Sequence, residues 1–189
     1  MKSIEEKILK DGVVINNDII KVDNFLNHQI DIKVMREFAD GVKDFFANAQ
    51  IDKVLTIETS GIAVAYSVAE ALGDKLILFA KKSKSQIVDD NVYTANIKSF
   101  TRYSLSLVTV SKSYLNKGEK ILIVDDFLAE GNAAIGLIDM CHQAGAEVVG
   151  YATVIEKEFQ GGRKRIEELN IPVFSGAIIK SFKNNKPVF

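Results

Sequence analysis

The sequence predicts an α/β fold in which helices cover a central parallel sheet. Five short runs are apolar almost without interruption, which is typical of strands buried on both faces of a sheet. These runs lie at residues 54–57, 76–79, 121–124, 148–155 and 173–179. Segments with apolar residues at intervals of three and four precede or separate them. Because helices and strands alternate along the chain, we expect parallel pairing with right-handed crossovers.

Three helices follow from this periodicity. The first lies within residues 31–50 and has Asp31 as its expected N-cap, because a short polar side chain can accept hydrogen bonds from the first free amides. The other two are expected at residues 62–72 and 132–144. A glycine follows each of these two segments, and glycine readily adopts the left-handed conformation that ends a helix.

The chain of 189 residues is expected to form one domain, 1–189. Two segments lie outside the alternation of strands and helices. Residues 18–30 mix apolar and amide side chains, and residues 84–103 are polar and lack a clear period. A long polar insertion in a compact domain is often a lid over an active site, so we expect residues 84–103 to form a flexible loop.

Composition excludes several classes of function. Lysine and arginine total 24 against 25 acidic residues, which disfavours a protein held to nucleic acid by bulk positive charge. The single cysteine, Cys141, cannot form an intramolecular disulfide or a zinc cluster and is interpreted as a packed thiol. No apolar run approaches the roughly 20 residues of a membrane-spanning helix. We therefore expect a cytoplasmic protein without a membrane or nucleic-acid partner.

The strongest chemical signal is the segment KILIVDDFLAEGNAA at residues 120–134. An apolar strand leads into Asp125 and Asp126, and a small turn around Gly131 leads into a helix. Free amides at a helix start favour a bound phosphate, and two carboxylates can accept hydrogen bonds from a vicinal diol. From spacing alone, acids that merely cap the next helix are an equally good interpretation.

Two further segments carry weaker signals. The segment TIETSGIA at residues 56–63 is another strand, turn and helix, and from these residues alone an N-cap by Thr59 or Ser60 is favoured over an anion site. The segment FAKKSK at residues 79–84 ends a strand with three closely spaced lysines. Such a charge run is usually a solvated surface, although it also suits a polyanionic ligand.

Taken together, these segments resemble the type I phosphoribosyltransferases. VDDFLAEGNAA is similar to the family's signature for phosphoribosyl pyrophosphate (PRPP), although Glu130, Asn132 and Ala133 replace the usual threonine-rich surroundings of the loop glycine. GVVINNDIIKVDNFLNHQID, TIETSGIA and VIEKEFQGGR extend the likeness in the right order over most of the chain. The variant signature is most similar to that of bacterial family members that use xanthine.

The resemblance implies a set of site residues. Asp125 and Asp126 would be catalytic and bind the ribose diol. The residues implied to bind PRPP are Ser60, Gly61, Lys81, Lys82, Ala129, Glu130, Gly131, Asn132 and Ala133. The residues implied to bind xanthine are Ile20, Asn27, Lys157 and Phe127. Asn27 and Lys157 suit the carbonyl oxygens of an oxopurine, and Phe127 is slightly preferred over Phe159 for stacking on the base.

The resemblance also implies an organisation and a reaction. Hood elements at about residues 1–30 and 157–189 would cover a core at about residues 31–156. The expected enzyme is a homodimer that uses Mg²⁺ carried with PRPP and makes xanthosine 5'-monophosphate (XMP) in purine salvage. Transfer to hypoxanthine or guanine is the alternative within the class. A PRPP-sensing regulator is the alternative outside it, but little of the chain precedes the first core strand. A dinucleotide-binding dehydrogenase is excluded because no G-x-G-x-x-G follows a strand.

Overall fold

A computed structural model describes residues 1–82, 91–98 and 105–189 of the chain. Within these residues, seven strands form one sheet in the order β5-β6-β4-β3-β7-β8-β9. Five of them pair in parallel. They are β4 (Leu76–Lys82), β3 (Lys53–Ile57), β7 (Lys120–Leu128), β8 (Glu147–Lys157) and β9 (Val173–Ile179). The predicted parallel sheet is therefore confirmed, and all but β9 extend beyond the apolar runs that predicted them.

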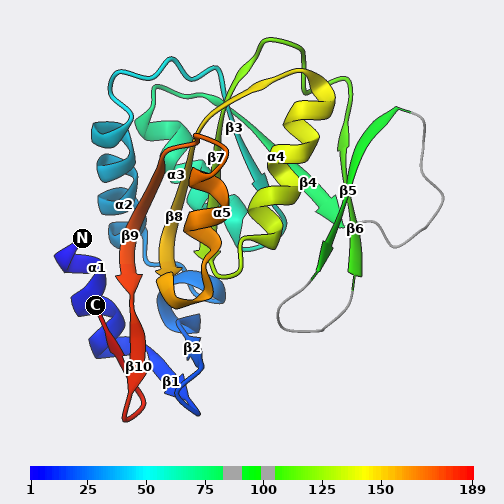
Figure 1. Ribbon diagram of the computed structural model, residues 1–189. Helices are drawn as coiled ribbons and strands as arrows, with labels where there is room; N and C mark the ends of the chain where they lie inside the picture. The colour runs from blue at the N-terminus through cyan, green and yellow to red at the C-terminus, as the bar shows by residue number, and fades with distance from the viewer. Residues whose placement is uncertain (83–90, 99–104) are drawn as a thin grey trace.

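Helices cover both faces of this sheet (Figure 1). α2 (Ile32–Phe45) and α3 (Gly61–Ala71) lie on one face, and α4 (Asn132–Ala144) and α5 (Gly162–Glu167) lie on the other. The sequence of β7 does not alternate between apolar and polar residues, because the strand packs against helices on both sides. Leu122 packs toward α2 and α3, whereas Ile123 packs toward α4. Both faces of the strand are thus buried, as the continuous apolar run predicts.

The predicted helix boundaries are largely confirmed. The side chain of Asp31 accepts hydrogen bonds from the amides of Lys33 and Val34, so it caps α2 as expected. α4 spans the predicted residues and ends at Gly145, whose φ of 70° lies in the left-handed region. α2 stops at Phe45, before the predicted end of the apolar pattern.

The prediction of an aperiodic loop at residues 84–103 is wrong over its middle part. Val92–Lys98 forms strand β5, which pairs antiparallel with β6 (Leu105–Ser111), and β6 pairs antiparallel with the end of β4. The buried side chains of Ala95 and Ile97 pack into the core under α4. The segment contains few apolar residues in alternation with polar ones, so its sequence gives only a weak strand signal, which explains the error. The remainder of the predicted loop lies outside the described residues.

Segments from both ends of the chain lie beyond the sheet, and we refer to them together as the hood. The N-terminal part consists of α1 (Lys2–Asp11), the hairpin of β1 (Val13–Ile15) and β2 (Ile19–Lys21), and a π-helical turn, η1 (Asp23–Asn27). The C-terminal part is the hairpin of β10 (Ser181–Lys183) and β11 (Lys186–Val188). Figure 1 shows both hairpins beyond the carboxyl ends of β8 and β9. Among the described residues, no helix is long and apolar enough to cross a membrane.

Candidate active site

A cavity of about 230 Å³ opens at the carboxyl ends of β3, β4 and β7. This is the edge of a parallel sheet at which ligands generally bind. The cavity brings together most of the residues predicted from the sequence to bind PRPP. Those that line it are Ser60, Lys82, Ala129, Glu130, Gly131, Asn132 and Ala133. The predicted catalytic acids Asp125 and Asp126 line it as well, and so does Phe127, which was predicted to bind the base. Tyr151 and Glu58 also line it and had no distinguishing sequence signal.

Asp125 and Asp126 are adjacent residues near the carboxyl end of strand β7. The carboxylate of Asp125 is buried, and its Oδ1 accepts a hydrogen bond of 2.9 Å from the amide of Asp126. Burial, followed by the neighbouring charge of Asp126, raises the pKa of Asp125 well above its usual value. The pair can therefore offer a proton donor and a charged acceptor side by side, which suits two adjacent hydroxyl groups.

The turn at residues 129–133 presents backbone amides at the start of α4. Gly131 has a φ of 79°, a conformation that side chains disfavour, and it stands immediately before the helix. A Cβ atom at Gly131 would lie 3.1 Å from the Cα atom of Gly162. Gly131 therefore packs directly against Gly162, and the turn lines the cavity at the positive end of the helix dipole.

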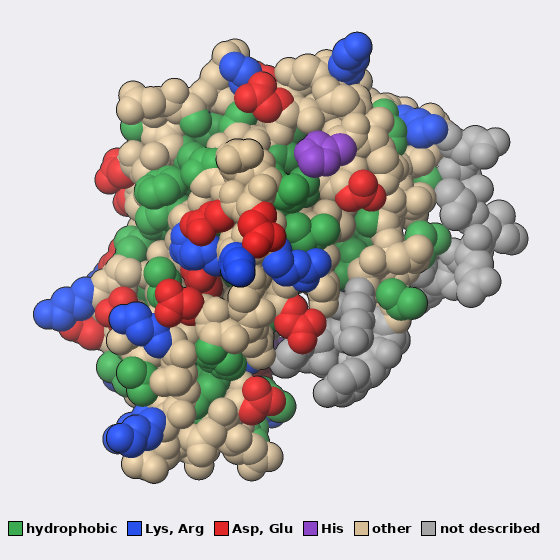
Figure 2. Space-filling model, in the orientation of Figure 1, with side chains coloured by type: hydrophobic (Ala, Val, Ile, Leu, Met, Phe, Trp, Pro, Cys, Tyr) green, Lys and Arg blue, Asp and Glu red, His purple; other side chains and the backbone are tan. Residues whose placement is uncertain are grey.

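Residues of α5 hold this turn from outside. The amide of Gly162 donates a 3.0 Å hydrogen bond to the carbonyl of Ala129. Nη1 of Arg165 donates to the carbonyl of Glu130 and, at 2.9 Å, to Oδ1 of Asn132. Figure 2 shows acidic and basic side chains gathered across this part of the surface. Arg165 has no distinguishing pattern in the sequence, so this contact was not predicted.

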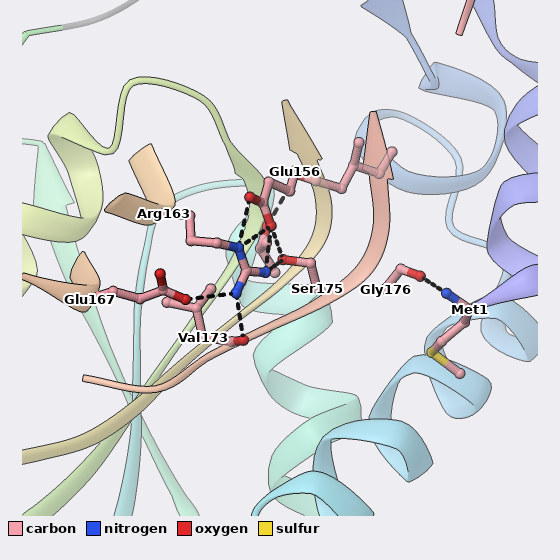
Figure 3. A network of polar contacts seen from close by, with 9 residues as sticks. Met1, Glu156, Arg163, Glu167, Val173, Ser175 and Gly176 are labelled. Carbon is pink, nitrogen blue, oxygen red and sulfur yellow. Dashed lines mark hydrogen bonds and ion pairs between the residues drawn. The ribbon is translucent and has the colours of Figure 1, made fainter. Parts of the chain in front are cut away.

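A buried ion pair anchors α5 to the sheet (Figure 3). Arg163 donates to both carboxylate oxygens of Glu156, with distances of 2.9 Å from Nε to Oε1 and 2.7 Å from Nη2 to Oε2. Ser175 of β9 also donates to Glu156, whose side chain is fully buried. The bidentate geometry ties α5 to β8 and β9, and the hydrogen bond with Glu156 raises the pKa of Arg163.

The start of α3 forms the opposite wall of the cavity. Ser60 occupies the N-cap position but makes no capping hydrogen bond through its side chain, so the capping interpretation does not hold for this residue. A Cβ atom at Gly61 would lie 2.2 Å from Oγ1 of Thr56 and 3.1 Å from Oδ1 of Asp125. Only glycine lets the helix start approach the carboxylate so closely.

Lys81 and Lys82, the two lysines at the end of β4, line different hollows. Lys82 lines the cavity. Lys81 lines a second hollow, and its Nζ lies 5.7 Å from the centroid of the Phe79 ring. The structure thus brings Lys82, and not Lys81, to the other residues predicted to bind PRPP.

Of the residues predicted to bind the base, Phe127 lines the cavity, whereas Ile20, Asn27 and Lys157 lie on the hood side and do not line it. Lys157 is buried at the end of β8, where its Nζ donates a 3.0 Å hydrogen bond to the carbonyl of Asp18. Burial lowers the pKa of Lys157. Ile20 is buried in β2 and belongs to the same apolar cluster that Phe127 packs against. Asn27 is exposed at the end of η1. Phe127 therefore joins the phosphate cavity to the hood.

Comparison with known proteins agrees with this geometry. Residues 21–185 match the family described as phosphoribosyl transferase domain. Xanthine phosphoribosyltransferase 1 of Clostridium perfringens is 48% identical over 189 residues, and xanthine phosphoribosyltransferase of Clostridioides difficile is 47% identical; in each case all of both chains is covered. This chain belongs to the phosphoribosyltransferase family.

Solved structures show the same fold at lower identity. The adenine phosphoribosyltransferase of Giardia lamblia, complexed with 9-deazaadenine, aligns with a TM-score of 0.78 at 18% identity and covers 93% of this chain and 97% of that one. The adenine phosphoribosyltransferase of Rhodothermus marinus aligns with a TM-score of 0.74 at 22% identity, covering 95% and 100%. These likenesses support the fold alone.

Proposed function

We propose that the protein transfers the 5-phosphoribosyl group of PRPP to N9 of xanthine, giving XMP and pyrophosphate in purine salvage. The observation that carries the proposal is a cavity lined by the acid pair, the turn at residues 129–133 and Phe127. Lys157 does not line this cavity; it is buried on the hood side of Phe127, where its Nζ contacts Asp18. Relatives of the same full length that bear the name xanthine phosphoribosyltransferase support the choice of base.

In this proposal the cavity holds PRPP along its length. The amides of residues 129–133 bind the 5'-phosphate, and Asp125 and Asp126 bind the ribose hydroxyls. Ser60 and the backbone at Gly61 contact the pyrophosphate, with Lys82 beside it. Of the two lysines first considered, we assign this role to Lys82, because the side chain of Lys81 lies over Phe79.

The reaction is a displacement at the anomeric carbon, with pyrophosphate as the leaving group. Its transition state has oxocarbenium character, so holding the reactants in line and stabilising the departing charge supply most of the acceleration. Lys82 is placed to neutralise that charge. Mg²⁺ would enter with PRPP and offset the charge of the pyrophosphate, and the carboxylates of Asp125 and Asp126 are hard oxygen donors that suit such a complex.

The base would lie between Phe127 and the hood. The ammonium of Lys157 can donate only, so it pairs with a carbonyl oxygen of xanthine, whereas an exocyclic amine would offer it no good acceptor. Asn27 supplies an amide that both donates and accepts, and Ile20 forms an apolar wall. Hypoxanthine and guanine also carry a carbonyl at C6 and are therefore the competing substrates.

The decisive experiment supplies PRPP and Mg²⁺ with xanthine, hypoxanthine, guanine or adenine and measures nucleotide formation. We expect the highest kcat/KM with xanthine and the lowest with adenine. Replacing Lys157 with Met, which has a similar length but no donor, should lower kcat/KM for xanthine by about 10- to 100-fold, since a buried hydrogen bond to a charged donor is lost. Equal use of all four bases, or no nucleotide at all, would contradict the proposal.

A regulatory role on the same fold is less well supported. The residues before β3 form α1, the first hairpin, η1 and α2, which pack into the core and the hood and leave no separate DNA-binding unit in this segment. The net charge of -1 adds no general attraction for nucleic acid.

We further propose a cytoplasmic homodimer. A hollow of about 580 Å³ between β4 and β6 is lined largely by apolar side chains. Three of them, Leu76, Phe79 and Tyr114, are exposed as large hydrophobic groups, and a second copy of the chain would cover them. Sedimentation of the wild type and of Leu76→Glu tests this, with the dimer expected for the first and a monomer for the second.

A further inference from the structure

Each hairpin of the hood turns through two adjacent asparagines. Asn16 and Asn17, followed by Asp18, connect β1 to β2, and Asn184 and Asn185 connect β10 to β11. All four have φ between 50° and 54°, a left-handed conformation that asparagine tolerates better than most residues. Such turns match the natural twist of a hairpin. Local turn chemistry explains why asparagine occurs at these positions, but it does not explain how the two hairpins meet.

The two turns are joined to each other by a reciprocal pair of hydrogen bonds. The amide of Asn17 donates to Oδ1 of Asn185 at 3.0 Å, and the amide of Asn185 donates to Oδ1 of Asn17 at 2.6 Å. The partners are 168 positions apart in the chain. Each side chain thus satisfies the backbone of the other turn, and the pair, here called the Asn17–Asn185 clasp, links the N-terminal and C-terminal parts of the hood.

The clasp lies beside the position of Lys157. The carbonyl that accepts the hydrogen bond from Lys157 Nζ belongs to Asp18, the residue that follows Asn17. The same Nζ lies 5.9 Å from the centroid of the Phe182 ring, which belongs to the other hairpin. The ammonium therefore contacts one residue from each hairpin, and the clasp joins the same two hairpins.

We propose that the Asn17–Asn185 clasp positions the ammonium of Lys157 and thereby sets the affinity and selectivity for the base. The proposal rests on the proposed role of Lys157 in reading xanthine. A lysine side chain has many rotamers, and its orientation depends on the groups that hold its tip. When the hairpins part, the fraction of molecules with a correctly placed ammonium falls, and the apparent affinity for the base falls by the same fraction.

The test compares two asparagines of the same turn. Asn185→Gly removes the acceptor of the clasp, while glycine keeps the positive φ of the turn. Asn184→Gly is the matched control, because it changes the neighbouring residue of the same turn and leaves Asn185 in place.

We expect Asn185→Gly to raise the KM for xanthine about three- to tenfold, the equivalent of losing one or two neutral hydrogen bonds. The KM for PRPP should stay at the wild-type value, and Asn184→Gly should resemble the wild type. Asn185→Asp retains an oxygen acceptor and should restore most of the affinity.

A second comparison separates positioning from a general loss of structure. In a Lys157→Met background, Asn185→Gly should have little further effect on xanthine, because the side chain that the clasp positions is already absent. The clasp proposal is overturned if Asn185→Gly matches Asn184→Gly, if it raises both KM values equally, or if its effect persists undiminished beside Lys157→Met. These results differ from a failure of the proposed base site, in which Lys157→Met alone would leave the KM for xanthine unchanged.

Discussion

The acid pair and the phosphate turn, here called the phosphate half, come from one continuous stretch of chain, whereas the hood half joins residues up to 168 positions apart. In the first, the end of β7, the turn at residues 129–133 and the start of α4 follow each other directly. In the second, Lys157 from β8 meets Asp18 from the first hairpin and Phe182 from the last. A substitution in the phosphate half should change the use of PRPP, and one in the hood should change the choice of base.

The largest effect is expected at Gly131. Gly131→Val forces a branched side chain into a positive φ and against Gly162, so the amides of the turn move away from the phosphate. A misplacement of about 1 Å can cost about 100-fold in rate, and we expect at least that loss in kcat/KM for PRPP. Gly118→Val is the control, because Gly118 has a φ of 81° and no atom of the described residues lies within 4 Å of the place that its Cβ would occupy. Equal losses in both variants would show that backbone strain alone is responsible.

The next effect concerns the acid pair. Asp126→Ala removes an acceptor for a ribose hydroxyl and should reduce kcat/KM for PRPP by about 10- to 100-fold, since a hydrogen bond to a charged group contributes about 1.5–3 kcal/mol. Circular dichroism and the thermal transition should stay close to those of the wild type. The ratio of xanthine to hypoxanthine use should also be unchanged. A shift in that ratio would break the division between the two halves.

A smaller effect is expected from removing Arg165, whose side chain holds the phosphate turn. Arg165→Ala removes the donor to Glu130 and Asn132 and should raise the KM for PRPP about five- to tenfold, the equivalent of about 1–1.5 kcal/mol. Lys164→Ala changes the exposed neighbour and serves as its control. If the two variants behave alike, the turn does not depend on the side chain of Arg165 for its shape.

The smallest effect is one of stability and depends on pH. The pKa of Asp125 is raised in the folded protein, so the contribution of this group to stability is fully present below its ordinary value of 3.8 and is lost as the pH rises through the raised pKa. Asp125→Asn removes the buried charge. It should raise the melting temperature by about 2–5 °C at pH 8 while impairing PRPP use, and this gain should shrink toward pH 5. A gain that is independent of pH would contradict the assignment.

Much of the fold was readable in the sequence because its signals are local. The continuous apolar runs of β7 and β9 reflect burial on both faces, and Gly145 ends α4 through its own backbone freedom. β5 was not predicted, because only a few apolar residues alternate with polar ones in its sequence. The place of β6 and β5 at the edge of the sheet depends on antiparallel pairing of β6 with β4 and of β5 with β6, which no local pattern encodes.

For the site, the sequence by itself determined the acid pair, the glycine turn and the helix that follows, since neighbours in the chain build that half. The structure alone decided that Lys82 and not Lys81 faces the cavity, because the direction of a side chain in a strand depends on which face of the sheet is covered. It alone also placed Arg165 on the phosphate turn and Asn17 on Asn185. These contacts join segments that meet only after the sheet and the hood have assembled, so their partners leave no pattern in either segment alone.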